Sequence, residues 1–600
     1  MSILQELRRR KVFRLVALYI VGAWVVLQVA DLAFESWEIS SSALRFVWLG
    51  AVLGFPIALI FGWRYDITTR GIVRTPPADE GAHIDLSLRR TDYVILALLM
   101  VVATGVIYQL TIQISDSRSP ELAEIIQQVI EPNSIAVLPL DNLSGDPEQA
   151  YFVSGMHEAL IAGLSRISAL RVTSKTSTLR YAKSVESLPR IAAQLGVARL
   201  IEGSIFRADN RVRITLNLVD ALLDERIWSE TFENEIEDVM VLQSEVAQAI
   251  AQQVEVTITP VEQAQFKDTR SVNPAAYEAY LKGQFHIERF TPQDMVLAGQ
   301  YYLEVMQLDP DYALALVGLS KLCGYQSQAG LLTPEQANAR CLPSTRKALD
   351  LDATLPEAHM SYAGFMTWQQ FKWQEGEAAF LRAIELNPSY AEARMFYSHY
   401  LTLIGRADEG TEQMRLTLLL DPLNPFVQGL SGAQRLMLDD YRGAVRIIED
   451  VMASTPGFGF GHLISWHANH VLGERGKAVA AAANHFRVTR GDPTGAEALE
   501  EAYVDGNYRG ALRHTAEVLT EHSKTAYVQP MTIGTLYEQA GDVEKAIDWF
   551  EIAFREFDPT APYMGVLTHS NAVHSNPRFI RLLREMKLDY WADKYSQSNE

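Results

Sequence analysis

Cysteine and basic charge are both scarce in this 600-residue chain, and each scarcity excludes a class of protein. The chain has only two cysteines, Cys323 and Cys341, which is too few for a disulfide-rich scaffold or a four-cysteine zinc site. It has 53 Lys and Arg residues against 73 Asp and Glu residues, which gives a formal net charge of −20. Because nucleic-acid phosphates bind basic surfaces, we expect no nucleic-acid partner.

The common catalytic and nucleotide-binding motifs are missing as well. The sequence has no phosphate-binding loop, no GxSxG elbow, no HExxH pair, no dinucleotide fingerprint and no kinase signature. The thirteen histidines are dispersed, and the closest group is His462, His467 and His470. A metal site there would need a carboxylate or cysteine at matching spacing, so surface or interface histidines are the favoured interpretation. We predict a chain that is not an enzyme, without catalytic residues, metal or cofactor.

The first 115 residues of the chain have the character of a membrane region. Three stretches without charge, at 15–30, 46–63 and 93–115, have 16, 18 and 23 residues, and a membrane-spanning helix needs about 17–25. The first reaches that length only by crossing Asp31. A cleaved signal peptide is the alternative for it, but no small-residue cleavage site follows. We predict three transmembrane helices.

The distribution of basic residues predicts the orientation of these helices. Five basic residues precede the first stretch and five lie between the second and third, whereas the loop between the first and second contains only Arg45. By the positive-inside rule, the N-terminus and the loop at 64–92 are cytoplasmic. The expected location is the bacterial inner membrane, multi-pass, with residues 116–600 in the periplasm. Gly50 and Gly54 have a spacing that lets helices pack closely, so a homo-oligomer through these helices is conceivable, although chance explains the spacing better.

Residues 133–258 predict an α/β domain. Residues 135–138 form an apolar run typical of a buried strand, a helix follows from about 147, and 170–178 and 187–195 read as a second strand and helix. In 211–220, apolar and polar residues alternate strictly, which predicts an antiparallel strand with one wet face. With strands near 199–207 and 226–232 and a closing helix at 237–256, the order is β-α-β-α-β-β-β.

A polar loop follows the first of these strands. Asp141, Asn142, Ser144 and Asp146 stand between a strand and a helix, where phosphate and metal sites are often built. Turn and cap chemistry is the favoured interpretation, with Asp146 capping a helix that Pro147 begins. Whether Asp141 and Asn142 meet a ligand stays open.

Six strings of this domain resemble, in order, the TolB-N-terminal-like α/β domain of bacterial proteins that also carry tetratricopeptide (TPR) repeats. They are SIAVLPL, SGDPEQAYFVSGMHEALIAGLSRI, LRVTSKTST, ARLIEGSIFR, RVRITLNLVDA and RIWSETF. The strings ELRRRKVFRLVALYIVGAWVVLQVADL and LGFPIALIFGWRYDITTRGIVR are similar to the membrane region of the same group. Relatives carry an adenylate-cyclase, kinase or winged-helix effector ahead of the spans, whereas here about a dozen residues precede the first span, so we expect no effector there. The resemblance implies a non-enzymatic envelope or sensory module.

Residues 273–595 contain a repeat. The strings VMQLDPDYALA, ALDLDATLPEA, AIELNPSYAEA and TLLLDPLNPFV place Pro310, Ala353, Pro388 and Pro422 at equivalent positions, 43, 35 and 34 residues apart. A period of 34 residues is typical of TPR helix pairs, which stack into a superhelical solenoid. We count about seven or eight repeats and a C-terminal cap.

Two sets of candidate site residues follow from the repeats. Groove positions lie on the first helix of each repeat, which predicts the following lining residues: Ser361, Phe365, Trp368, Met395, His399 and Thr402. Phe365 and Trp368 could equally belong to the core between repeats. Cys323 and Cys341 flank a turn expected near 324–333, so a disulfide could join them in an oxidising compartment, and two buried free thiols are the equal alternative.

The predicted organisation is therefore multidomain. It comprises a tail at 1–14, a membrane region at 15–115, a linker at 116–132, the α/β domain at 133–258, a linker at 259–272 and the all-α repeat array at 273–595. The predicted function is a membrane-anchored scaffold or sensor that binds a protein or peptide in its TPR groove. The alternative is a signal-transduction component related to adenylate-cyclase-type receptors, acting through a separate cytoplasmic effector.

Overall fold

The computed structural model divides the chain into two compact units, Met1–Ser119 and Pro120–Glu600. It describes residues 19, 54–56, 65–68, 71–74, 131–208, 210–221, 223–267, 272–289, 292–455, 457–490, 493–504 and 506–597.

The first unit contributes one described hairpin. Strands β1 (Tyr65–Thr68) and β2 (Gly71–Arg74) pair antiparallel inside the loop predicted at 64–92. The three predicted membrane spans lie outside the described residues, apart from Tyr19 and Gly54–Pro56. None of the helices in the described part of the chain has the length and apolar character that crossing a membrane requires.

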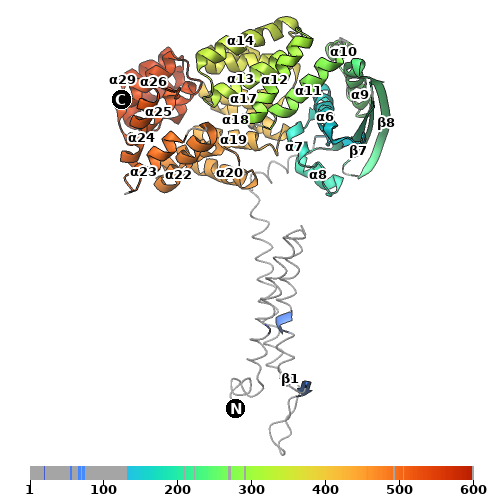
Figure 1. Ribbon diagram of the computed structural model, residues 1–600, viewed down its shortest axis with the longest axis horizontal. Helices are drawn as coiled ribbons and strands as arrows, with labels where there is room; N and C mark the ends of the chain where they lie inside the picture. The colour runs from blue at the N-terminus through green and yellow to red at the C-terminus, as the bar shows by residue number, and fades with distance from the viewer. Residues whose placement is uncertain are drawn as a thin grey trace, which may run out of the picture. The chain divides into compact units, whose positions relative to one another are not determined.

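The second unit begins with an α/β domain built on a mixed sheet (Figure 1). The sheet order is β5-β3-β6-β7-β8, with β4 also paired to β6. Strand β3 runs parallel to β5 and β6, whereas β6, β7 and β8 are antiparallel neighbours. The strands are β3 (Ser134–Val137), β4 (Asp141–Asn142), β5 (Arg171–Val172), β6 (Arg199–Ala208), β7 (Arg211–Asp220) and β8 (Glu225–Glu235).

Helices pack on the two faces of this sheet. One face meets α6 (Ala150–Ser165) and α9 (Val239–Gln253), and the predicted alternation in β7 is confirmed because its four inward residues Val212, Ile214, Leu216 and Leu218 are fully buried there. The other face meets α8 (Leu188–Leu195) through residues such as Ala136 and Leu200. A short 3₁₀ turn precedes each of α6 and α9, at Pro147–Gln149 and Ile236–Asp238.

The predicted strand at 170–178 is wrong over most of its length. Strand β5 has two residues, and the chain then forms α7 (Lys175–Leu179). The Thr-rich sequence favours a strand, but tertiary contacts override it. Ser174 N–H donates to Leu420 O at 2.8 Å, and buried Lys175 places its Nζ 2.8 Å from Glu288 Oε1. The segment predicted as a linker at 259–272 likewise contains a helix, α10 (Pro260–Lys267).

The rest of the unit is a solenoid of antiparallel helix pairs (Figure 1). The first helices are α11 (Pro274–Ile287), α13 (Ala313–Gln328), α15 (Pro356–Gly364), α17 (Ala391–Leu403), α19 (Pro425–Met437), α21 (Phe460–Leu472), α23 (Thr494–Ala502) and α25 (Pro530–Ala540). The second helices are α12 (Pro292–Leu308), α14 (Pro334–Leu351), α16 (Trp373–Leu386), α18 (Ala407–Leu420), α20 (Tyr441–Ser454), α22 (Arg475–His485), α24 (Tyr508–His522) and α26 (Val543–Arg555).

The repeat positions identified in the sequence end these second helices as predicted. Helices α12, α16 and α18 stop two residues before Pro310, Pro388 and Pro422, and α14 stops two residues before Ala353. Proline cannot continue a helix and disfavours the helical conformation of the residue before it. Two single π-helical segments, Phe365–Gln369 and Phe486–Arg490, extend α15 and α22.

The C-terminal segment folds back onto the middle of the array. It consists of α27 (Met564–Leu567), α28 (Asn571–His574), α29 (Pro577–Glu585) and α30 (Asp589–Gln597), after a 3₁₀ turn at Ala561–Tyr563. Trp591 Nε1 donates to Leu403 O at 2.7 Å, and Trp373 Nε1 donates to Met586 O at 2.7 Å. The eighth helix pair and the cap therefore meet the third and fourth pairs, and the array closes on itself.

The α/β domain is joined to the array by shared core as well as by hydrogen bonds. Tyr277 and Leu281 of α11 belong to the same buried cluster as α6 and α9. On the opposite side, Arg171 Nη1 donates to Leu419 O at 2.8 Å and Ser177 Oγ donates to Asp421 Oδ1 at 2.6 Å. The two parts thus form one compact body.

Candidate functional site

The structure buries most of the residues predicted to line a groove. The side chains of Phe365, Trp368, Met395, His399 and Thr402 are each exposed by 4% or less. They cannot contact a ligand in this arrangement, so the prediction of an open groove at these positions is corrected. Ser361, the sixth, lines a cavity.

Two kinds of contact produce this burial. Phe365 packs with Cys341 and Met395 packs with Met414 and Val427, so both belong to the core between repeats, the alternative stated above for Phe365. The closure of the array adds to this burial at His399. The rings of His399 and Tyr563 lie 6.3 Å apart, and Tyr400 and Leu403 pack in one cluster with Met586, Trp591 and Tyr595. The chain's own C-terminal segment therefore covers part of the face, on α17, that an open TPR array offers to a partner.

Cys323 and Cys341 lie opposite each other on the antiparallel pair α13 and α14. Their Cα atoms are 6.0 Å apart and their sulfur atoms are joined as a disulfide. That separation falls within the range that disulfide geometry requires. The turn between the two helices is shorter than expected, because α13 continues to Gln328.

The cavity that contains Ser361 lies between the α/β domain and the first repeats. It has a volume of about 240 Å³, and α6, α11, α13 and α15 contribute to its wall. Its ammonium groups are paired, Lys175 with Glu158 and Glu288 and Lys321 with Glu392. The pair between Lys175 and Glu288 joins the α/β domain to the first repeat across this cavity.

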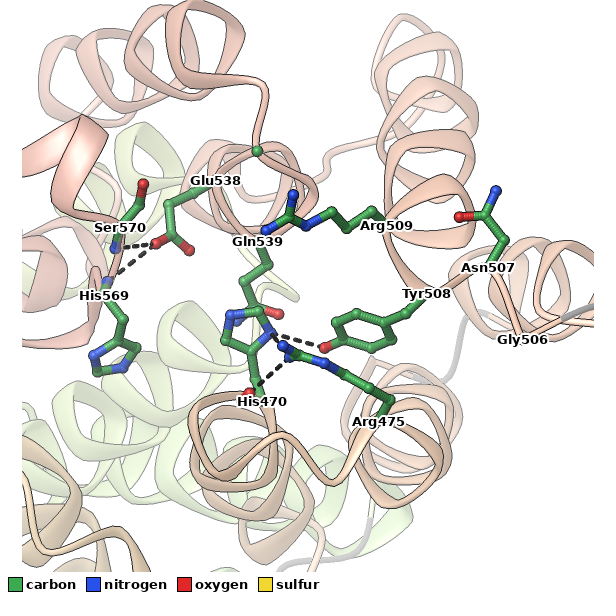
Figure 2. A pocket seen from close by; sticks show the side chains of 11 residues that line it. His470, Arg475, Gly506, Asn507, Tyr508, Arg509, Glu538, Gln539, His569 and Ser570 are labelled. Carbon is green, nitrogen blue, oxygen red and sulfur yellow. Dashed lines mark hydrogen bonds between the residues drawn. The ribbon is translucent and has the colours of Figure 1, made fainter.

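A larger pocket, of about 440 Å³, lies where the ends of three neighbouring repeats meet (Figure 2). Its wall comes from the end of α21, the starts of α22 and α24, the end of α25 and the segment before α28. The lining residues are His470, Arg475, Gly506, Asn507, Tyr508, Arg509, Glu538, Gln539, Gly541, His569 and Ser570. Most of them are polar, which distinguishes this pocket from the apolar seams between helices.

Glu538 is the acidic group at the base of the pocket. Its side chain is only 4% exposed, and Oε1 accepts hydrogen bonds from the backbone N–H groups of His569 at 3.0 Å and Ser570 at 2.7 Å. Its other oxygen, Oε2, is buried and has no partner among the described residues. Burial raises the pKa of Glu538 from 4.5 to about 7, because the apolar surroundings penalise the charged carboxylate.

Gln539 contributes a hydrogen-bond donor to the same pocket. Its Oε1 accepts from the indole Nε1 of Trp466 at 2.9 Å. Since an indole can only donate, this bond fixes which end of the amide is the oxygen. The amide nitrogen Nε2 is then a buried donor for which no partner occurs in the described part of the chain.

His470 and Arg475 form the opposite wall. His470 Nδ1 accepts from Tyr508 Oη at 2.9 Å and from Arg475 Nη1 at 3.3 Å, and Arg475 Nη1 also donates to His470 O at 2.7 Å. Burial and the arginine charge lower the pKa of His470 to about 3, so the ring is neutral at neutral pH. The Arg475 guanidinium also lies 4.7 Å from the centre of the Tyr508 ring.

Arg509 carries a second positive charge at the rim. Its side chain is exposed, and Figure 2 shows it extending from the start of α24 toward the side where Glu538 and Gln539 lie. Neither Arg475 nor Arg509 forms an ion pair with any described carboxylate of the chain. The pocket therefore combines a cationic rim with an acidic base.

His569 completes the base. Its Nε2 is buried and has no partner among residues that the structure describes, and burial lowers the pKa of His569 to about 4. A neutral imidazole can donate or accept at this nitrogen, depending on its tautomer. Three unsatisfied polar atoms, from Glu538, Gln539 and His569, thus belong to residues that line one pocket, where unpartnered buried polar atoms are costly.

The histidine group noted in the sequence is divided by the fold. His470 lines the pocket, whereas His467 is buried beside Trp466, with ring centres 5.2 Å apart. In the described ranges, no set of three or more His, Cys, Asp or Glu side chains is arranged to hold a metal ion.

The polar loop after β3 has the turn structure expected of it. Asn142 Oδ1 accepts from Ser144 N at 3.0 Å, and Asp146 Oδ1 accepts from Glu148 N at 2.9 Å. Gly145 has φ +74°, a conformation that favours glycine. Asn142 is therefore engaged within the loop, and exposed Asp141 pairs its backbone with β6.

Sequence reasoning missed Glu538, Gln539, Arg509 and His569 as a site. One signal was available. Gly541 ends α25 in the left-handed conformation, so Glu538 sits in the last turn of a helix, where the helix dipole disfavours a negative charge. A carboxylate at such a position opposes the helix dipole, so helix stability does not explain it.

No protein-family model matches the chain. A Rhizobium meliloti (strain 1021) protein named "Putative adenylate cyclase 3" is 32% identical over 250 residues, which is 41% of this chain and 42% of that protein. The matched part thus spans less than half of that relative's length.

Solved structures with similar helical repeats include human IFIT1 bound to m7Gppp-AAAA, at 13% identity, and a TPR protein from Parabacteroides merdae, at 14%. The first similarity covers 77% of this chain and 97% of that one, with a TM-score of 0.36. The second covers 45% and 100%, with a TM-score of 0.30. Both TM-scores lie below 0.5, so neither structure carries an argument about function. The chain is similar to repeat proteins in its helical architecture.

Proposed function

We propose that this chain is a non-enzymatic, membrane-anchored scaffold or sensor that binds a protein or peptide partner at the polar pocket of its repeat array. The observation that carries the proposal is the pocket's three buried polar atoms without partners, on Glu538, Gln539 and His569. A binding site leaves such atoms open for the ligand to satisfy, because the folded chain alone gains nothing from them. Because most of the predicted groove positions are buried, we place the proposed site at the polar pocket and not at that groove.

A photo-crosslinking amino acid at Glu474 tests this proposal in intact cells. Glu474 is exposed, adjoins Arg475 at the rim and makes no side-chain cap hydrogen bond. We expect a discrete protein adduct from position 474 and none from exposed Glu556, on the neighbouring repeat. The adduct must also disappear when Glu538→Gln is combined with the crosslinker at unchanged protein level. Equal adducts from both positions, or an adduct indifferent to Glu538→Gln, would contradict the proposal.

The proposed location is the bacterial inner membrane, with residues 116–600 in the periplasm. The uncharged stretches, the arginine asymmetry and the paired cysteines support it, since disulfides persist in oxidising compartments. Single cysteines at Glu80 and Glu556, in a chain lacking Cys323 and Cys341, test the orientation. We expect a membrane-impermeant thiol reagent to label position 556 in permeabilised outer membranes, and position 80 only after the inner membrane is disrupted. The reverse pattern would refute this orientation.

The second candidate function is signal transduction through a separate cytoplasmic effector, as in adenylate-cyclase-type receptors. The partial match to the Rhizobium meliloti protein favours it. The identity of crosslinked proteins separates the candidates. A nucleotide cyclase captured from a crosslinker in the predicted loop at 64–92 would select this second function, and an envelope protein captured from position 474 selects the first.

A further inference from the structure

The chemistry of the polar pocket specifies the group that it receives. Its wall includes Glu538 Oε2, an acceptor with negative charge when ionised, and Gln539 Nε2, a donor. Both atoms are held in place, because Oε1 of each side chain is already bonded, Glu538 to two backbone N–H groups and Gln539 to Trp466. A ligand that satisfies both atoms needs a charged donor for Glu538 and an oxygen acceptor for Gln539.

The two arginines at the rim of the pocket require that the ligand also carry a negative charge. The described hydrogen bonds of the Arg475 guanidinium go to neutral groups, His470 among them, and exposed Arg509 has no ion pair with a described residue. A purely cationic ligand such as a polyamine would meet two arginines on entry. A purely anionic ligand such as phosphate would place its charge against Glu538 at the base. Only a ligand with both charges satisfies the two ends together.

We propose that the pocket recognises an α-ammonium group with an adjoining oxygen acceptor, as found in a free amino acid or at the amino terminus of a peptide. The ammonium binds Glu538 Oε2, the adjoining carbonyl or carboxylate oxygen accepts from Gln539 Nε2, and a ligand carboxylate faces Arg475 and Arg509. The assignment rests on the proposed function, because it names the group that the same pocket takes.

Four probes test the assignment on the full-length chain in nanodiscs by isothermal titration calorimetry. They are L-glutamate, the peptide Ala-Asp-Ala, the same peptide with an acetylated amino terminus, and succinate. We expect acetylation to weaken peptide binding tenfold or more, since it removes a charge-assisted hydrogen bond to a buried carboxylate, and succinate not to bind. Tighter binding of L-glutamate identifies a free amino acid as the source, and tighter binding of Ala-Asp-Ala identifies a peptide terminus.

Two variants attribute the binding to the pocket. Glu538→Gln is expected to weaken binding of the better probe tenfold or more, and Arg509→Gln several-fold, whereas Glu556→Gln binds like the parent chain. Arg509 is exposed, so this variant keeps the test independent of folding. Equal binding of the free and acetylated peptides, or binding by none of the probes, would overturn the assignment. A crosslinked partner at position 474 without binding of any probe would contradict the assignment and leave the proposed function standing. Probe binding without a crosslinked partner would contradict the proposed function and leave the assignment standing.

Discussion

Glu538→Gln is expected to stabilise the folded protein at pH 8 by about 3 kcal/mol while it weakens ligand binding tenfold or more. Burial raises the folded pKa of Glu538 from 4.5 to about 7. Between these values the folded state holds a proton that the unfolded state has released, so stability falls as pH rises from about 4.5 to about 7. The difference between the two pKa values corresponds to about 3 kcal/mol of stability that the charged carboxylate loses at pH 8. The amide that replaces the carboxylate stays neutral, so the variant avoids this loss.

The pH dependence of this difference is the decisive measurement. Urea denaturation of the full-length chain, followed by tryptophan fluorescence, is expected to show the largest gain for the variant at pH 8 and almost none near pH 4.5. The charged and titratable groups that line the same pocket are His470, Arg475, Arg509 and His569, and they are common to both proteins, so their titration cancels in the comparison. The exposed control Glu556→Gln should show no such trend. A constant difference across pH would mean that the carboxylate does not carry the raised pKa.

Trp591→Ala is expected to destabilise the chain by about 3–5 kcal/mol, the usual cost of truncating a buried tryptophan. Trp591 is 7% exposed, donates to Leu403 O at 2.7 Å, and packs with Tyr595 at a ring separation of 6.2 Å. The loss should extend to α17, which lies far away in the sequence, because its last turn supplies that acceptor.

Hydrogen exchange followed by mass spectrometry measures directly which helices lose stability in this variant. In Trp591→Ala, we expect peptides from Ala391–Leu403 to lose protection together with those from the C-terminal helices. Trp549→Ala is the matched control, since Trp549 is only partly buried and lies on α26. Protection lost solely within 561–597 would show that the cap folds back without supporting the middle of the array.

Local patterns in the sequence were sufficient to predict the elements of the fold. The alternation at 211–220 predicted β7 because one face of that strand is exposed to solvent and the other is buried. The prolines at 310, 388 and 422 predicted helix ends because proline cannot continue a helix. Each of these sequence patterns determines the backbone conformation of residues close to it in the chain. They failed at 173–178, where long-range bonds to Leu420 and Glu288 decide the backbone conformation.

The candidate site depends on contacts that no local pattern contains. Its residues come from five separate segments between His470 and Ser570, and their approach is set by the stacking of whole repeats. The predicted groove failed for a related reason. The positions of Trp368 and His399 on first helices were read from the repeat, but the return of the C-terminal segment, which buries them, has no signature within a repeat.

The closure of the array also limits how its length can change. An open solenoid can gain or lose a repeat, because each repeat contacts only its neighbours. Here the bond between Trp373 and Met586 joins residues 213 positions apart, and its geometry holds only for the present number of helix pairs between them. Inserting or deleting one pair would move the cap away from its acceptors and expose the part of α17 that it covers. The repeat number in this chain is therefore a fixed structural parameter, and duplication or loss of a single repeat should abolish folding rather than extend or shorten a surface.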